Sequence, residues 1–411
     1  MRVTISREGL CLHSNLAARA VAKCWSLVGR GELEVSKLLM GGECGRSAAS
    51  YARTIGDLLR PSRPIAESPH AALLRDYQAE GESIFSPGRF EMTAYYQNAA
   101  QCIETFGSYF GAREPGAIFL RAKRFLAMFD GKLLDTPGPY ENTPGSLPVA
   151  RRIRFSDCYE IVHGLHRLSI AAVRGTTKEK CIIELSEPVL TPLQQMVMDS
   201  SWNQESRELY QPVPSAELSG WQVIRRCTDR LEMMTRWLDG RIRGGSYLDI
   251  GCSYGWFGAE MAKRGFKISG VDRDAAALAV GHLVYGLDGA ANKAGDIVKF
   301  LDAQTRQYDV VSCFSVLHHF ALGKMQHTAE ELIRRIDAVT AKVLFFDTAE
   351  SHERWFSADL PAWDAEFIRE WLRDHTSFSR VETLGTDGDS VGRYRSQYGR
   401  HLFVCSRSLL K

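Results

Sequence analysis

The stretch from residue 246 onward alternates short apolar runs with helical segments, and this alternation limits the fold more than any other feature. We predict strands from the apolar runs at 246–250, 266–271, 309–314 and 342–346. We predict helices at 256–264, 275–285 and 328–338. Strands separated by helices at this spacing form a parallel sheet with right-handed crossovers. The pattern therefore predicts an α/β domain, which an antiparallel pair at 377–384 and 401–405 would complete.

The N-terminal half has a mixed pattern that indicates an α+β domain. Residues 88–130 read as mainly helical, and their aromatic residues are typical of a helical core. Strands are expected at 149–153, 159–162 and 180–185, with a helix at 167–174. A long helix is expected over 218–238. The resulting domain prediction is a segment at 1–65, an α+β domain at 66–195, a linker with the long helix at 196–243, and the α/β domain at 244–411.

Composition excludes several classes of protein. The 51 Lys and Arg residues nearly balance the 49 Asp and Glu residues, so the net charge of +2 argues against a nucleic-acid partner. No apolar run is long enough to span a membrane, and the N-terminus lacks a secretory signal, so we expect a cytoplasmic protein. No two of the ten cysteines lie within four residues of each other, which disfavours a zinc site, and we expect no metal.

A glycine loop follows the predicted strand at 246–250 and opens the predicted helix at 256–264. Its glycines stand at 251, 255 and 258, and Asp249 precedes the first. Asp272 ends the second strand, where a carboxylate accepts hydrogen bonds from both hydroxyls of a ribose. NAD-binding sheets share this acid, but their loop reads G-x-G-x-x-G, whereas this loop reads G-x-x-x-G-x-x-G.

The loop and the acid resemble those of the class I S-adenosylmethionine-dependent methyltransferases, whose first motif reads roughly D-x-G-x-x-x-G. Gly295-Asp296-Ile297 resembles the acid that follows the third strand of that family, and residues 308–319, YDVVSCFSVLHH, resemble its fourth motif. The resemblance implies a Rossmann-like seven-stranded sheet and S-adenosylmethionine as the cofactor. The cofactor-binding residues that it implies are Asp249, Gly251, Cys252, Ser253, Tyr254, Gly255, Trp256, Asp272, Arg273, Asp296, Ile297 and Phe314.

His318 and His319 follow the fourth strand, at the edge where ligands bind. Histidine suits proton removal near neutral pH, so either is a candidate catalytic base, with His319 favoured because it lies farther past the strand. The alternative is that one of them packs under the cofactor or caps the next helix. Asp347, after the fifth strand, is another candidate at the same edge, although such carboxylates often cap helices.

Residues 156–183 resemble the ParB/sulfiredoxin-like domain. The match rests on Asp157, Tyr159, Ile161, Gly164, His166, Arg167, Leu168, Ala171 and Gly175, whereas His163 and Leu165 depart from the family pattern. A glycine turn that leads into a helix with basic residues is a candidate anion site, which we assign to Gly164, His166 and Arg167. The alternative is that Arg167 pairs with a nearby carboxylate. Arg393, Arg395 and Arg400 are candidates for binding an anionic substrate, or are solvated charges beside the last strand.

The sequence is consistent with three hypotheses about the function of the whole chain. The first is a methyltransferase that O-methylates a sugar, a phosphorylated glycan or a related small metabolite, with an N-terminal module that binds an anion or a nucleotide. The second is a bifunctional kinase–methyltransferase or a nucleotide hydrolase–methyltransferase, which requires a carboxylate facing Arg167, with Glu67, Glu80 and Asp157 as candidates. In the third, the N-terminal half only recognises the substrate.

Overall fold

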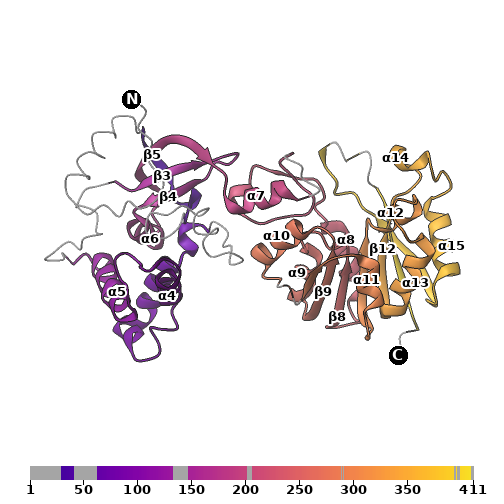
Figure 1. Ribbon diagram of the computed structural model, residues 1–411, viewed down its shortest axis with the longest axis horizontal. Coiled ribbons are helices and arrows are strands. Elements are labelled where there is room, and N and C mark those ends of the chain that lie inside the picture. The colour runs from indigo at the N-terminus through magenta and orange to yellow at the C-terminus, as the bar shows by residue number, and fades with distance from the viewer. Residues whose placement is uncertain are drawn as a thin grey trace. The chain divides into compact units, whose positions relative to one another are not determined.

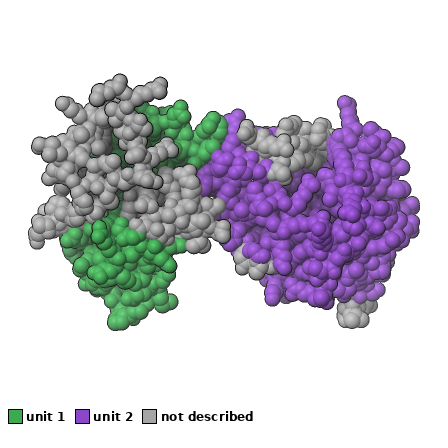
Figure 2. All heavy atoms as spheres, viewed as in Figure 1, with its two compact units in different colours: residues 1–58, 62–190 green, residues 59–61, 191–411 purple. Residues whose placement is uncertain are grey.

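The computed structural model describes residues 29–40, 63–132, 147–200, 206–287, 289, 291–392, 395 and 399–408. The chain divides into two compact units, which Figure 2 colours separately. Unit 1 comprises residues 1–58 and 62–190, and unit 2 comprises residues 59–61 and 191–411. Among the described residues, no helix is both long and apolar enough to cross a membrane.

Unit 2 is built on a seven-stranded sheet in the order β10-β9-β8-β11-β12-β14-β13. Its strands are β8 (Gly245–Ile250), β9 (Phe266–Asp272), β10 (Asn292–Ala294), β11 (Tyr308–Phe314), β12 (Thr340–Asp347), β13 (Arg380–Thr386) and β14 (His401–Ser406). The first five are parallel, and β14 runs antiparallel to both β12 and β13. The predicted parallel sheet and its antiparallel final pair are confirmed.

Helices cover both faces of this sheet (Figure 1). One face packs against α8 (Thr228–Leu238) and α9 (Trp256–Lys263), and the other against α11 (Ile297–Asp302), α13 (Ala329–Val339) and α15 (Ala365–His375). The remaining helices of the unit are α7 (Pro192–Asp199), η5 (Ala216–Leu218), α10 (Ala275–Tyr285), α12 (Leu317–Ala321) and α14 (Arg354–Ser357). Because both faces are covered, the central strands are buried apolar runs, as parallel sheets require.

The long helix predicted over 218–238 is wrong in its first half. Only Thr228–Leu238 is helical, as α8. Before it, β7 (Gln222–Val223) pairs with β6 (Glu208–Leu209), and the carbonyl of Ile224 accepts a hydrogen bond from Val391 N–H. Cys227 has a φ of 64°, which ends the extended segment and turns the chain into the helix. Tertiary hydrogen bonding therefore overrides the apolar spacing that suggested a helix.

Unit 1 combines a five-stranded sheet with helices. Its strand order is β1-β5-β3-β4-β2. The strands are β1 (Gly29–Glu34), β2 (Leu38–Leu39), β3 (Val149–Ile153), β4 (Tyr159–His163) and β5 (Lys178–Val189). The helices are η2 (Val35–Lys37), η3 (Ile65–Glu67), α3 (Pro69–Glu80), η4 (Gly81–Phe85), α4 (Ala94–Phe106), α5 (Pro115–Phe129) and α6 (Leu165–Val173). The sequence places the start of this domain at 66, but β1 and β2 already belong to its sheet.

Two hydrophobic cores stabilise unit 1. One lies among α3, α4 and α5 and includes Phe90, Tyr95, Tyr109 and Phe125, which confirms the expected aromatic core. The other lies between the sheet and α6. The cysteines that the structure describes are buried, and they are Cys102, Cys158, Cys181, Cys227, Cys252, Cys313 and Cys405.

The packing of α10 against the glycine loop of unit 2 leads to a prediction of stability. A Cβ added to Gly281 on α10 would lie 2.2 Å from the carbonyl oxygen of Tyr254, which belongs to rigid backbone. We expect Gly281→Ala to lower the free energy of unfolding by about 1–3 kcal/mol through overpacking. Urea denaturation measures this change. Gly116→Ala on α5, where a Cβ would meet nothing within 4 Å, is the control, and equal stability of the two variants would contradict the prediction.

Candidate active site at the carboxyl edge of the sheet

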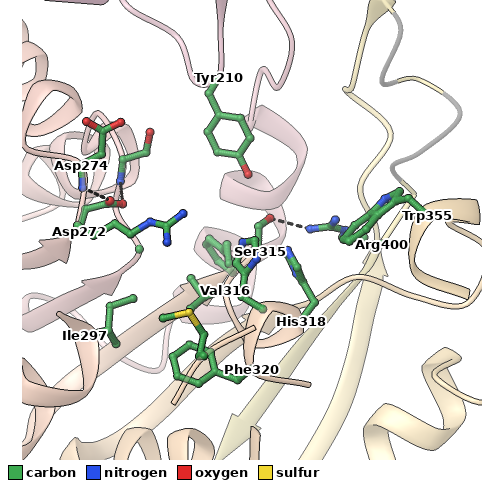
Figure 3. A pocket seen from close by; sticks show the side chains of 16 residues that line it. Tyr210, Asp272, Asp274, Ile297, Ser315, Val316, His318, Phe320, Trp355 and Arg400 are labelled. Carbon is green, nitrogen blue, oxygen red and sulfur yellow. Dashed lines mark hydrogen bonds between the residues drawn. The ribbon is translucent and has the colours of Figure 1, made fainter. Parts of the chain in front are cut away.

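A cavity of about 390 Å³ lies at the carboxyl edge of the unit 2 sheet, next to the neighbouring strands β8 and β11. After β8 the chain adds strands on one side of this pair, and after β11 it adds strands on the other side. Such a switch point is where open α/β sheets bind ligands. Figure 3 shows the side chains around the cavity. They are Tyr210, Gly251, Ser253, Asp272, Arg273, Asp274, Ile297, Phe314, Ser315, Val316, His318, His319, Phe320, Met325, Trp355 and Arg400.

The glycine loop between β8 and α9 forms part of the cavity through its backbone. Gly251 has a φ of 75°, and a Cβ there would lie 2.4 Å from Cγ2 of Val316, so only glycine fits. The N–H groups of Gly251 and Cys252 both donate to the carbonyl of Val271. The N–H of Ser253 donates to Oδ2 of Asp272 at 2.8 Å. These bonds hold the loop against the end of β9.

Asp272 ends β9 and faces the cavity, with Asp274 beside it (Figure 3). Its Oδ1 accepts the N–H of Asp274 at 2.9 Å. Burial raises the pKa of Asp272, and its two backbone N–H donors oppose that rise. The carboxylate is therefore fixed in orientation while it borders the cavity. A fixed acceptor at this position suits the two neighbouring hydroxyls of a ribose.

Asp249 lies in β8 beneath the cavity and does not line it. Its Oδ1 accepts the hydroxyl of Ser312 at 2.6 Å, while its buried Oδ2 has no hydrogen-bond partner among the described residues. Burial raises the pKa of Asp249 to about 7. The sequence predicts Asp249 as a cofactor ligand, but its side chain is buried and does not line the cavity.

Other predicted cofactor residues divide into two groups. Cys252, Tyr254, Gly255 and Trp256 do not line the cavity, and the side chains of Cys252, Tyr254 and Trp256 are buried. At Gly255 a Cβ would lie 2.6 Å from Leu287, so this glycine serves close packing. Asp296 is exposed and caps α11 by accepting the N–H of Lys299. Gly251, Ser253, Asp272, Arg273, Ile297 and Phe314 line the cavity.

Both predicted histidines line the cavity, on the short helix α12. Their ring centroids lie 4.3 Å apart. His318 is buried, and its Nδ1 has no hydrogen-bond partner among the described residues. Burial and then Arg400 lower the pKa of His318 well below its usual range. His319 is more exposed, and its pKa is lowered by partial burial and then by Arg273 and Lys324, so it is neutral at pH 7.

A buried ion network beside the cavity was not found from the sequence. The Ser315 hydroxyl accepts hydrogen bonds from Arg225 at 2.7 Å and from Arg400 at 2.9 Å. Arg225 also pairs with Asp387, and Arg400 pairs with both oxygens of Glu353. Ser315 has a φ of 60°, a region that non-glycine residues seldom adopt. The network thus holds a serine in an unusual backbone conformation at the edge of the cavity.

Asp347 belongs to this network and does not act as a ligand at the edge of the sheet. It accepts Arg230 at 2.7 Å and the N–H of Ser315 at 2.7 Å. Although burial raises its pKa, the three guanidinium groups together hold the pKa of Asp347 below its usual range. It is therefore an ionised, fully paired carboxylate that positions the end of β11.

Tyr210 and Trp355 also line the cavity but carry no sequence signal for this role. Tyr210 precedes the methyltransferase-like motifs and projects into the cavity from above in Figure 3. Trp355 lies on α14 after β12 and is 41% exposed. Among the arginines predicted to bind an anion, Arg400 is buried in the ion network, Arg395 is exposed outside the cavity lining, and Arg393 lies outside the described residues.

In unit 1, the predicted anion site is only partly assembled. Gly164 has a φ of 94°, and a Cβ there would lie 2.9 Å from Pro148, so the glycine is required for packing. His166 packs among aromatic rings, with its centroid 4.5 Å from that of Phe125 and 4.8 Å from that of His70. Burial lowers the pKa of His166 to about 3, so it carries no positive charge toward an anion.

Arg167 is half-buried, and burial lowers its pKa while Cys181 and Glu179 oppose that effect. Two of the three carboxylates predicted to face it have other partners. Asp157 pairs with Lys37 at 2.9 Å, and both oxygens of Glu80 bind Arg89. Glu67 lies on the exposed surface at η3. Glu179 on β5, which no sequence motif indicates, lies close enough to raise the pKa of Arg167.

The residues around the cavity fit S-adenosylmethionine. Asp272 offers acceptor oxygens, the Gly251 turn admits close approach of a ligand to the backbone, and Ile297, Phe314 and Val316 offer apolar contacts. No cluster of three or more His, Cys, Asp or Glu residues suited to a metal occurs in the described part of the chain.

Comparisons with known proteins point to the same chemistry. Residues 222–392 match a family model described as a methyltransferase domain. A ubiquinone biosynthesis O-methyltransferase of Acinetobacter baumannii (strain AYE) is 34% identical over 89 residues, which cover 20% of this chain and 38% of that protein. The enzyme of the same name from Pseudomonas aeruginosa (strain LESB58) is 34% identical over 91 residues, covering 21% of this chain and 39% of that protein. The chain thus spans about two fifths of the length of these relatives.

Solved structures also resemble parts of the chain. A crystal structure of WbdD aligns over 53% of this chain and 48% of that one, with 20% identity and a TM-score of 0.42. Magnesium protoporphyrin IX methyltransferase (ChlM) from Synechocystis PCC 6803 aligns over 44% of this chain and 79% of that one, with 21% identity and a TM-score of 0.32. The family model and the cavity together identify residues 222–392 as a methyltransferase domain, and S-adenosylmethionine is its cofactor.

Proposed function

We propose that the protein transfers a methyl group to a hydroxyl oxygen of a small acceptor, such as a sugar, a phosphorylated glycan or a related small metabolite. The observation that carries this proposal is the arrangement of one cavity. Asp272 and the Gly251 turn border one part of it, and His318 and His319 border another. A cofactor site and a candidate base thus open into the same space. The size of the cavity is in the range of small-molecule sites, which favours a small acceptor.

The residues divide the work of such a transfer. S-adenosylmethionine would supply a methyl group from its positively charged sulfur. The sulfur is the leaving group and becomes a neutral thioether. The Asp272 carboxylate accepts the ribose hydroxyls, and the Gly251 turn brings the backbone close to the ligand. Because the displacement is in line, the main task of the protein is to align the acceptor oxygen with the methyl group.

His319 is the proposed base. A base must remove the hydroxyl proton as the oxygen forms its new bond, and a neutral imidazole does so near neutral pH. Partial burial, and then the positive charges of Arg273 and Lys324, lower the pKa of His319 and keep its ring neutral at pH 7, and the ring borders the cavity. His318 is buried beside it and packs against Trp355, so we assign His318 a supporting role.

We further propose that unit 1 is a recognition module that binds, through Arg167, an anionic group of the substrate distinct from any group that lies beside the methylated hydroxyl. A half-buried guanidinium near a glycine turn supports this role. The pairing of Asp157 with Lys37 and of Glu80 with Arg89 favours recognition over phosphoryl transfer, because two of the three candidate acids are already engaged.

The role of Asp272 is tested by Asp272→Asn, which keeps the shape of the side chain and removes its charge. We expect the affinity for S-adenosylmethionine to fall by about 1–3 kcal/mol, since a charge-assisted acceptor is lost. Isothermal titration calorimetry measures the change. Asp302→Asn, at an exposed carboxylate paired with Arg335, is the control. Equal affinity of wild type and Asp272→Asn would remove Asp272 from the site.

The base is tested by His319→Ala, which should lower kcat by about 10²-fold. The readout is S-adenosylhomocysteine released with a panel of monosaccharides and monosaccharide phosphates. Because the pKa of His319 is lowered, the acidic limb of the wild-type kcat/KM profile should fall below pH 6.5, and the variant should lose that limb. Full activity of His319→Ala, together with an inactive His318→Ala that still binds the cofactor, would assign the base to His318.

The role of unit 1 is tested with residues 191–411, which keep α7 because it packs against α10 in unit 2. We expect this fragment to bind S-adenosylmethionine with the affinity of the full chain, because the residues around the cavity belong to unit 2. Its methyl transfer should fall by about tenfold or more, since the anion contact is lost. Transfer at the full-length rate would show that unit 1 is not needed for recognition.

A further inference from the structure

Trp355 is unusual among the large apolar side chains of unit 2 because it borders the cavity yet is 41% exposed. Its indole N–H donates to Oε2 of Glu353 at 2.9 Å. Since the polar edge of the ring is already satisfied, the ring has no need of a further hydrogen bond. An exposed indole beside a ligand cavity is a surface on which a flat ring packs.

The orientation of Trp355 is fixed by its hydrogen bond to Glu353. Glu353 is fully buried, and its two oxygens accept Nε and Nη2 of Arg400 at 2.7 and 3.0 Å. Arg400 in turn donates to Ser315 at 2.9 Å. The carboxylate that holds the indole is thus itself held by a bidentate ion pair, which restricts its rotation. Trp355 is therefore a fixed surface, although it is exposed.

Lys324 lies next to this surface. Its Nζ is 6.0 Å from the centroid of the Trp355 ring, and no carboxylate pairs with it in the part of the chain that the structure describes. The lysine side chain is exposed. The centroid of His318 lies 5.4 Å from that of Trp355, so the indole, the ammonium group and the histidine pair form one group.

Acidic and basic side chains lie at different ends of the cavity. Asp272 and Asp274 lie at one end, whereas Trp355 and Arg400 lie at the other (Figure 3). Lys324 adds a positive charge at the second end, since its Nζ lies 6.0 Å from the centroid of the Trp355 ring. Glu353 is neutralised by its bidentate pair with Arg400. The end that holds Trp355 is consequently positive, which favours an anionic ligand there.

We propose that Trp355 and Lys324 form the acceptor subsite, and that the acceptor is a ring-bearing alcohol with an anionic group attached. The ring packs on the indole face, and the anionic group pairs with the ammonium of Lys324. This inference rests on the proposed methyl transfer and narrows its acceptor. A sugar phosphate and a hydroxyaryl carboxylate share this chemistry.

Binding of matched probes to the full-length protein tests the subsite without any need for turnover. With S-adenosylhomocysteine saturating the cofactor site, calorimetry compares glucose 6-phosphate with glucose, and 3,4-dihydroxybenzoate with 3,4-dihydroxybenzyl alcohol. We expect the anionic member of one pair to bind about tenfold more tightly than its neutral partner. The pair that shows this preference identifies the sugar phosphate or the aryl carboxylate as the acceptor class.

Variants assign the preference to the two residues. Lys324→Ala should abolish the preference for the anionic probe, and Lys324→Arg should retain it. Trp355→Ala should weaken both members of that pair by about tenfold, while Trp355→Phe should retain most of the affinity because an aromatic face remains. Lys263→Ala, at an exposed lysine on α9, and Phe367→Ala, at an exposed aromatic residue on α15, are the matched controls.

Three results would overturn the subsite while the cofactor still binds. They are equal binding of anionic and neutral probes, failure of all four probes to bind, and an anionic preference that survives Lys324→Ala. Failure of S-adenosylhomocysteine to bind the wild-type protein is a separate outcome, because it would overturn the proposed methyl transfer and the subsite with it.

Discussion

The carboxyl edge of the unit 2 sheet depends on a buried network of ions centred on Ser315. Arg225, Arg230 and Arg400 are almost wholly removed from water, and Asp347, Asp387 and Glu353 balance them. Loss of one partner from such a network leaves an uncompensated buried charge, which costs about 3–5 kcal/mol. The network therefore requires four distant parts of the chain to meet at one place. These are residues 225–230 around the start of α8, the end of β11, the end of β12 with the turn after it, and the segment from the end of β13 to the start of β14.

That requirement explains which parts of the fold were predictable. Strands β8, β9, β11 and β12 and helices α9, α10 and α13 depend on local apolar runs and glycine turns, so they were predicted from the sequence, whereas β10, α11 and α12 were not. The segment 222–227 has an equally apolar pattern, but its conformation is set by hydrogen bonds to residues 209 and 391. Apolar spacing carries no information about such distant partners, and the predicted helix was wrong there.

The same difference separates the site residues that were predicted from those that were not. Asp272, Ile297, Phe314 and the two histidines were found because they stand in motifs at the ends of predicted strands. Asp249 stands in the same kind of motif, but its side chain is buried. Its direction was not predictable, because the motif alone does not set whether a strand residue points inward or outward. Tyr210 and Trp355 lie outside every motif. In unit 1, the match at 156–183 predicted the turn and helix, but the sequence did not show that His166 would turn into the aromatic core.

The position of β14 has a consequence for the order in which the domain is made. Among the strands that the structure describes, β13 pairs with β14 alone, and β14 is later in the chain. During synthesis β13 therefore has no strand partner until residues 401–406 have left the ribosome. Arg400 arrives with them, so the guanidinium that balances Glu353 is among the last groups to join the network. The described strands and helices of unit 1 all precede residue 191, and domains generally fold as separate units during synthesis. Unit 1 is thus free to fold while the methyltransferase domain is still incomplete.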